Sequence, residues 1–168
     1  SPDGINWTAR SAAGDDDSWQ SVTYGNGLFV AVGAAPTADR VMTSPDGINW
    51  TVRSAAGNND SWAGVTYGNG LFVAVGWSGD RVMTSPNGIT RTTQTAAGSD
   101  DTWYSVAYGN GLFVSVGEGG DKVITSTDGI NWTVRSAAGD DDGWQDVTYG
   151  NGLFAAVGSS GSDRVMTS

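Results

Sequence analysis

The sequence predicts an all-β fold, on three observations. Gly, Ser, Thr, Asn and Asp are abundant, whereas strong helix formers are few, since Lys122 is the only lysine and Glu118 the only glutamate. Asn-Gly between apolar runs, as in residues 67–76 (Tyr-Gly-Asn-Gly-Leu-Phe-Val-Ala-Val-Gly), predicts a tight β-hairpin, because both residues tolerate a positive φ. The apolar run that follows has no polar face, which is typical of a strand buried on both sides.

Four internal repeats of about 42 residues carry this hairpin. Each repeat contains a turn such as Ser-Pro-Asp-Gly, a short strand such as Thr-Val-Arg and a loop ending in acids. A strand led by Trp, the hairpin, a variable loop and a strand such as Arg-Val-Met-Thr-Ser follow. Four short strands per repeat without a helix are typical of a β-propeller blade. We expect one four-bladed domain with repeats 1–43, 44–84, 85–125 and 126–168, and with Phe29, Phe72, Phe113 and Phe154 buried between the blades.

The order of the strands also predicts how the ring of blades closes. If the Trp-led strand is innermost, the chain begins with an outermost strand, Ile5–Arg10, and ends with the third strand of the last blade, Arg164–Ser168. We expect these two segments to pair, which would remove the open sheet edges. The same seam could instead close between two chains and give an eight-bladed dimer. We therefore expect a monomer or a homodimer.

A hairpin between the third and fourth strands carries a resemblance to a known family. Ser44–Trp50, with its equivalents Ser1–Trp7 and Ser126–Trp132, resembles the Asp-box of bacterial neuraminidase-type repeats, found in sialidases, sortilin-like receptors and secreted propellers. We call these segments the box hairpins. They are one residue shorter than the family's Ser-x-Asp-x-Gly-x-x-Trp, and the third copy, Ser85–Arg91, lacks the Asp and the Trp. Because the family's box is structural, the resemblance implies a propeller fold more than an activity.

The composition excludes several classes of function. The chain contains no Cys and no His, which excludes disulfides, Ser-His-Asp and Cys-His catalysis, and ordinary transition-metal sites. A net charge of −10 argues against nucleic acid and anionic membranes as partners. No apolar run is long enough to span a bilayer, so we expect no membrane insertion. The scarcity of Lys and Glu favours a secreted or cell-surface protein.

Acidic loops precede the innermost strands and are expected to surround the mouth of the central channel. Ca²⁺ prefers several converging carboxylate and carbonyl oxygens, so a calcium site is one interpretation. The alternative is that Asp and Asn suit tight turns and keep the protein soluble. The candidate metal ligands are Asp15, Asp16, Asp17, Asp60, Asp100, Asp101, Asp140, Asp141 and Asp142. No other cofactor is expected.

Aromatic residues next to these loops are candidates for ligand binding. The Trp that leads each innermost strand either packs between blades or contacts a ligand. Trp77 and Tyr104 occur in one repeat only, so a repeated core does not require them. An aromatic face close to carboxylates suits a sugar or a methylated cation. The candidate ligand-binding residues are Trp19, Trp62, Trp77, Asp80, Trp103, Tyr104, Glu118 and Trp144.

These features together predict a non-catalytic, lectin-like binding module. We expect it to recognise a glycan or a protein surface through the face that carries the acidic and variable loops, because binding residues concentrate on loops held by a rigid scaffold. A glycoside hydrolase is an alternative, which needs two carboxylates at a fixed separation. Near-identical blades argue against one specialised pair, so no catalytic residue is predicted. A purely structural or engineered repeat scaffold without a ligand is a further alternative.

Overall fold

The structure is a computed structural model, and it describes residues 1–14, 18–34, 41–56, 61–77, 81–98, 102–119, 123–139, 143–161 and 164–168. Within these ranges the ordered elements are fifteen β-strands in four antiparallel sheets, as the sequence predicts. Each sheet is one blade, and its strands follow the chain order. No helix long and apolar enough to cross a membrane is found in the described part of the chain.

The strand bounds are as follows. Blade 1 contains β1 (Ser18–Gly25), β2 (Leu28–Ala34), β3 (Val41–Ser44) and β4 (Thr51–Arg53). Blade 2 contains β5 (Trp62–Gly68), β6 (Leu71–Gly76), β7 (Arg81–Ser85) and β8 (Thr92–Thr95). Blade 3 contains β9 (Thr102–Gly109), β10 (Leu112–Glu118), β11 (Val123–Ser126) and β12 (Thr133–Arg135). Blade 4 has only β13 (Trp144–Gly150), β14 (Leu153–Gly158) and β15 (Val165–Thr167).

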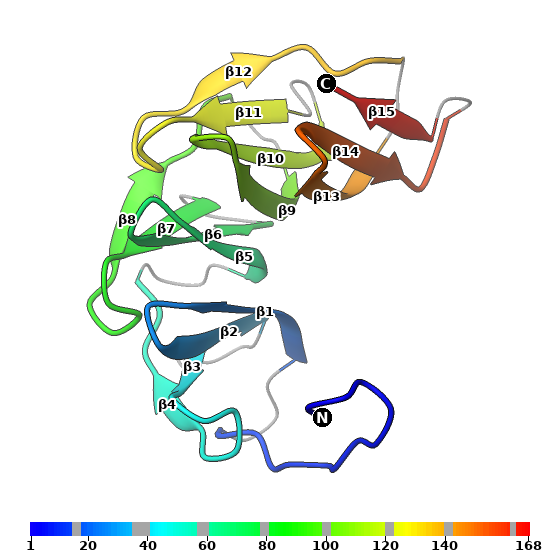
Figure 1. Cartoon of the computed structure of the whole chain (residues 1–168). Helices are drawn as coiled ribbons and strands as arrows, with labels where there is room; N and C mark the ends of the chain where they lie inside the picture. Colours follow the sequence, from blue (N-terminus) through cyan, green and yellow to red (C-terminus); the bar gives the residue numbers. More distant parts are fainter. Residues whose placement is uncertain are drawn as a thin grey trace.

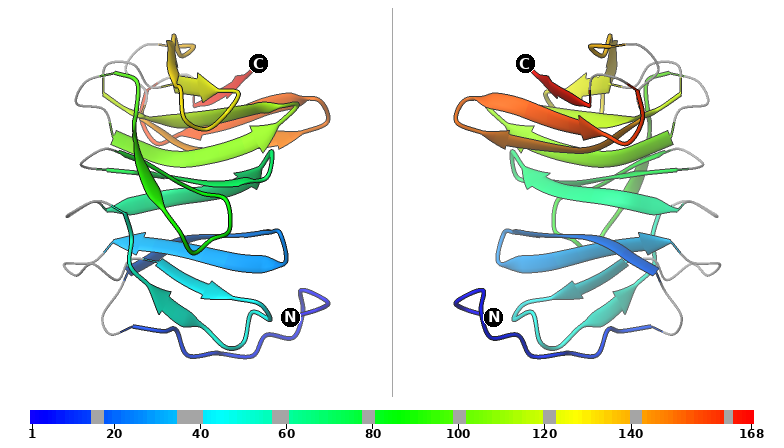
Figure 2. Two further views of the ribbon diagram at one scale, coloured as in Figure 1. Left: turned by 90° about the vertical axis from the view of Figure 1, so that its left-hand side faces the viewer. Right: turned by 90° about the vertical axis from the view of Figure 1, so that its right-hand side faces the viewer.

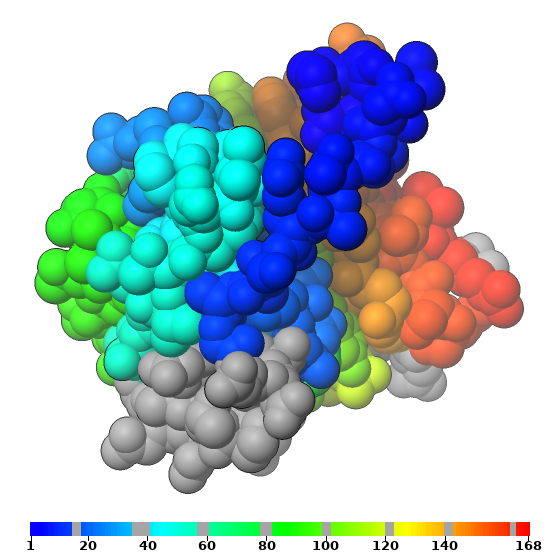
Figure 3. Space-filling model, turned by 90° about the horizontal axis from the view of Figure 1, so that it is seen from below, coloured from blue at the N-terminus to red at the C-terminus, as the bar shows by residue number. Residues whose placement is uncertain are grey.

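The four blades lie along an arc, with the innermost strands β1, β5, β9 and β13 on its concave side (Figure 1). Blade 1 and blade 4 occupy opposite ends of this stack, and the two termini lie far apart (Figure 2). Residues 1–14 form no strand and cross the surface on blade 1 (Figure 3). The predicted pairing of Ile5–Arg10 with Arg164–Ser168 is therefore not formed in this structure, because the arc keeps the two segments apart. Closure of the ring stays a prediction.

The Asn-Gly turns join the two inner strands of every blade. Asn69 has a φ of 49° and Gly70 a φ of 76°, and the other three turns have nearly the same values. Positive φ at both central residues is the geometry that matches the twist of a two-residue hairpin. The turn places Gly68 opposite Leu71 and so sets the register of β5 on β6.

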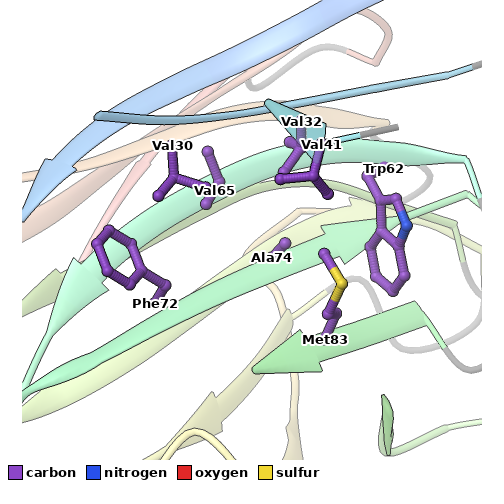
Figure 4. Close-up of a cluster of buried hydrophobic side chains, with 8 residues drawn as sticks. All are labelled: Val30, Val32, Val41, Trp62, Val65, Phe72, Ala74 and Met83. Carbon is purple, nitrogen blue, oxygen red and sulfur yellow. The ribbon is translucent and has the colours of Figure 1, made fainter. Parts of the chain in front are cut away.

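The core consists of three apolar clusters, one between each pair of successive blades. In the first, Val30, Val32 and Val41 of blade 1 pack against blade 2 residues that include Trp62 and Phe72 (Figure 4). Trp62 has no exposed surface, and Phe72 only 3%. Blades cannot bury these faces singly, so each is stabilised by its neighbour. Burial is confirmed for Phe72 and Phe113, whereas the equivalent rings of the terminal blades, Phe29 and Phe154, are half-buried.

Candidate binding site on the concave face

Each innermost strand contains one β-bulge directly after its Trp. In β5 the register shifts between Trp62 and Gly64, so that Ala63 has no partner on β6. The same shift occurs in the other three blades. A bulge redirects a side chain out of the regular alternation. The bulged residues and those that follow them vary between repeats, and they are Gln20-Ser21, Ala63-Gly64, Tyr104-Ser105 and Gln145-Asp146.

These variable residues meet in one cleft of about 410 Å³ on the concave face. It is lined by Gln20, Ser21, Ala63, Gly64, Trp77, Tyr104, Ser105, Gln145 and Asp146. All except Trp77 come from the bulges, so every blade contributes. The volume lies within the range of about 300–1,000 Å³ that small-ligand pockets occupy.

Two aromatic rings form one wall of the cleft. Trp77, directly after β6, meets Tyr104 of β9 edge-on, with ring centroids 6.3 Å apart and planes at 65°. The Trp77 backbone N–H donates to the carbonyl oxygen of Ser61 at 2.9 Å, which fixes the backbone at this position. Trp77 is 36% exposed, so part of its ring is open to a ligand.

The hydroxyl group of Tyr104 is protonated and fixed at neutral pH. Burial, a hydrogen bond to Glu118 and the negative charge of that carboxylate raise the pKa of Tyr104 to about 12. The phenol therefore stays neutral and serves as a hydrogen-bonding group beside the ring of Trp77. Glu118 itself is exposed at the end of β10.

A polar cluster also lines the cleft. The Ser105 Oγ donates to Oδ1 of Asp146 at 2.6 Å, and the backbone N–H of Val147 donates to the same oxygen at 3.0 Å. These two bonds hold Asp146 in one orientation. Among the described residues its Oδ2 has no hydrogen-bond partner, so it is an open acceptor. Gln145 is exposed next to it.

The predicted ligand-binding residues divide between this cleft and the core. Trp77 and Tyr104 line the cleft, and Glu118 contacts Tyr104. The fully buried Trp62, Trp103 and Trp144 belong to the core, in agreement with the packing interpretation, and cannot contact a ligand in this structure. Trp19 is half-buried and lines a second hollow on blade 1, which shares only Gln20 and Ser21 with the cleft. Asp80 lies outside the described residues.

The predicted metal ligands cannot be placed in the same way. Asp15, Asp16, Asp17, Asp60, Asp100, Asp101, Asp140, Asp141 and Asp142 all lie outside the described residues. In the part of the chain that the structure covers, no group of three or more His, Cys, Asp and Glu side chains is arranged to hold a metal ion. Calcium binding stays a prediction.

Sequence reasoning missed the polar half of the cleft. Gln20, Ser21, Ser105, Gln145 and Asp146 were not among its candidates. A signal was present, because aligned repeats differ at these positions although the flanking Trp and Val repeat. What the alignment does not show is the bulge that turns these side chains toward the concave face.

The box hairpins are held together by their own hydrogen bonds. Oδ1 of Asp46 accepts from the backbone N–H groups of Ile48 and Asn49, both at 2.8 Å. Together with the Asn49 and Ser44 side chains, these donors hold the pKa of Asp46 well below its usual range. In the third copy the amide oxygen of Asn87 accepts the equivalent backbone bonds. The carboxylate is therefore engaged within the turn.

Fold and cleft together define a β-propeller with a ligand-sized site at the inner edges of its blades. No protein-family model matches the sequence, and a search of curated proteins finds no match either. Among solved structures, the computationally designed protein Ika4 is similar to 97% of this chain over 98% of its own, with a TM-score of 0.71 and 12% identity. Virginiamycin B lyase from Staphylococcus aureus matches 82% of this chain, with a TM-score of 0.72 and 11% identity.

A third similar structure is YCF48 bound to D1 peptide, which matches 98% of this chain with a TM-score of 0.68 and 16% identity. The matched region is 47% of the lyase chain and 55% of the YCF48 chain, so this chain spans about half the length of both. These neighbours include an enzyme, a peptide-bound protein and a designed protein. At such low identity the similarity shows the propeller fold alone.

Proposed function

We propose that the chain is a non-catalytic binding module that recognises carbohydrate through the cleft on its concave face. One observation carries the proposal: the cleft is lined by residues from positions where otherwise similar repeats differ. A fold needs the same residues in every blade to pack its core. Variation confined to one cleft indicates that these positions are free of that requirement and available for a ligand.

The chemistry of the cleft suits a sugar. Trp77 and Tyr104 supply an apolar aromatic wall, and Asp146 supplies an oriented carboxylate acceptor. Sugars combine apolar C–H faces with dense hydroxyl groups, and a site for them needs both kinds of surface. Because the chain has a net charge of −10, we expect neutral or cationic sugars and not acidic ones.

Binding can be tested with an array of immobilised neutral, amino and acidic oligosaccharides, followed by calorimetry on the strongest ligand. Trp77→Ala and Asp146→Ala should each weaken the affinity at least about tenfold, the effect of losing 1.4 kcal/mol. Ile48→Ala is the matched control, because this exposed side chain does not line the cleft. Full affinity in both cleft variants would place the site elsewhere, and binding only to peptides would make the ligand a protein surface.

The proposal includes no turnover, because Oδ1 of Asp146 is engaged in hydrogen bonds and only its Oδ2 is open to a ligand. Asp146 accepts from Ser105 and from a backbone N–H, and among the described residues no second carboxylate lines the cleft. A glycoside hydrolase needs an acid and a base or nucleophile on opposite sides of the bond. Release of the aryl alcohol from aryl glycosides, abolished by Asp146→Ala, would show that the module is an enzyme.

For the box hairpins we propose the structural role that the Asp-box family implies. Asp3, Asp46 and Asp128 bond to their own turns, and Trp50 donates its indole N–H to the Gly47 carbonyl oxygen at 3.3 Å. The polar groups of the box thus form hydrogen bonds within their own hairpin. The box hairpin therefore stabilises the outer part of the blade, whereas the proposed ligand site lies at the inner strands.

A further inference from the structure

The same packing contact occurs between each pair of successive blades, where a Tyr ring of one blade covers a Gly of the preceding blade. A Cβ atom at Gly25 would overlap the ring of Tyr67 in the next blade. Gly68 is covered by Tyr108 and Gly109 by Tyr149 in the same manner. Only glycine fits under these rings, so this Tyr–Gly contact requires the same residue pair between each two blades.

At each end of the arc, one residue of this Tyr–Gly contact is present without the other. Nothing lies within 4 Å of a Cβ at Gly150 of blade 4, so this glycine has no ring over it. Tyr24 of blade 1 has no glycine to cover and is 58% exposed. Blade 4 therefore presents a vacant acceptor, and blade 1 presents the side chain that fits it.

The apolar residues around these two positions are unpaired as well. Val157 and Val165 on blade 4 are 48% and 65% exposed, whereas their equivalents between blades, such as Val32 and Val41, are fully buried. On blade 1 a hollow of about 270 Å³, lined in part by Trp19, Val22 and Met42, is open where blades 2 to 4 receive such valines. The two end faces are thus complementary halves of the contact that the chain makes three times internally.

The contact between blades 3 and 4 leaves a pocket open. It has a volume of about 350 Å³ and includes Val114, Phe154, Met166 and Ser168 in its lining. The equivalent space between blades 1 and 2 measures only about 10 Å³, because Gly88 and Arg91 of the third box hairpin fill it. Blade 4 lacks this box hairpin and its fourth strand, so the pocket stays open.

The N-terminal segment contains the missing parts. Residues 1–10 consist of a box hairpin followed by Thr8-Ala9-Arg10, which corresponds to the fourth-strand sequence Thr-Val-Arg of blades 1 and 3 with Ala in place of Val. Its Trp7 is 78% exposed, whereas the equivalent Trp50 and Trp132 are partly buried. The segment lies beside blade 1, at the opposite end of the stack from blade 4 (Figure 2).

We propose that a second copy of this chain completes the ring, with Tyr24 of each copy covering Gly150 of the other. In the same contact, residues 1–10 of each copy form the fourth strand of the partner's last blade. One chain cannot do this alone, because its end faces lie at opposite ends of a packed stack (Figure 2). Closing it would require all three interblade contacts to change their angle.

The exposed area of the chain agrees with an unpaired interface. It is 8498 Å² for a mass of 17.3 kDa, whereas a compact monomer of this mass exposes about 7,800 Å². The difference is close to the roughly 800 Å² that each partner buries in a standard interface. The arrangement has two-fold symmetry and pairs both end faces of each copy, which removes every open end.

The mass in solution is the first test. Light scattering of the 168-residue chain at micromolar concentration should give twice 17.3 kDa. A monomer, or a larger assembly such as a filament, would overturn the proposal. Gly150→Leu should raise the dissociation constant of the dimer at least about tenfold, because the new side chain occupies the place of Tyr24 and contacts nothing in its own chain.

Controls separate loss of the dimer from loss of folding. Thr133→Leu adds similar bulk at an exposed position on β12 and should leave the dimer intact. Tyr24→Ala removes the ring without adding bulk, so it serves if Gly150→Leu does not fold. Either variant in its monomeric form should keep the far-ultraviolet circular dichroism of the parent. A dimer of unchanged affinity in both variants would refute the Tyr–Gly contact.

The exchange of strands can be trapped covalently, because the chain has no cysteine of its own. Thr43 pairs with Thr51 in blade 1, so the same register places Thr8 of one copy opposite Thr167 of the other. Mixed T8C and T167C chains should form a disulfide-linked pair under mild oxidation, since paired strands bring Cα atoms within bonding range. T8C mixed with T92C should not. An internal disulfide in the monomeric double variant would show closure within one chain and refute the second copy.

Discussion

Phe72→Ala measures how much each interblade cluster contributes to stability. Phe72 is 3% exposed and packs in the cluster of Val30, Val65 and Met83, with its ring centroid 4.6 Å from that of Tyr67. Its backbone is fixed on both sides, because β6 pairs with Tyr67 of β5 and with Ser85 of β7. The space left by the ring therefore cannot collapse, and we expect the upper part of the range of about 3–5 kcal/mol for Phe→Ala.

For a chain of this length such a loss lowers the melting temperature by about 2–4 °C per kcal/mol, or roughly 8–20 °C in total. Urea and thermal denaturation, each followed by near-ultraviolet circular dichroism, give the free energy and the midpoint. Phe29→Ala in the Gly150→Leu background is the matched control, because there the same ring is half-buried and no second copy covers it. Its loss should be clearly smaller. A cost below about 1 kcal/mol for Phe72→Ala, or equal costs for both, would refute the interblade role of the ring.

Three further predictions concern the box, the cleft and the Tyr–Gly contact. The pKa values of Asp46 and Asp128 are lowered in the folded state, so their stabilising effect is complete above the usual value of 3.8 and is lost as the pH falls below it. The melting temperature of the Asp46→Asn/Asp128→Asn double variant should therefore depend less on pH in acid than that of the parent. In an ultraviolet titration, the tyrosine ionisation near pH 12 should be absent from Tyr104→Phe, and Glu118→Gln should move its midpoint toward 10.0. A midpoint unchanged in Glu118→Gln would disprove the Tyr104–Glu118 bond. Gly109→Ala should cost about 1–3 kcal/mol in urea denaturation because its Cβ overlaps the ring of Tyr149, whereas Gly150→Ala should leave the stability of the monomer unchanged.

The blades could be predicted from the sequence because their signals are local and repeated. An Asn-Gly pair sets a two-residue turn whatever surrounds it, and the observed φ values at Asn69 and Gly70 show that it does so here. Four copies of the same pattern then imply four equivalent sheets. The residues of the core follow from that equivalence, except in the terminal blades, where one neighbour is missing.

The curvature of the stack and the position of the N-terminal segment could not be predicted in this way. The angle between blades depends on how bulky side chains such as Trp62 and Tyr67 meet the preceding blade, and a repeat period does not contain that angle. Residues 5–10 have the sequence of an outer strand, yet a strand needs a partner edge to form. The arc keeps the edge of β15 away from them, so among the described residues the segment has no strand to pair with.

Repeated residues form the contacts between blades, and unrepeated residues line the cleft. The Tyr–Gly pairs and the buried valines recur in each blade and build the contact that a second copy would extend around the ring. The bulged positions differ between blades and build the cleft. Because Gln20 of blade 1 and Gln145 of blade 4 both line that cleft, two copies would place two clefts on one shared channel. A ligand long enough to occupy both would bind more tightly to the dimer by effective concentration alone. Gly150→Leu would then weaken binding of long oligosaccharides without changing a cleft residue, while short ones would bind as before.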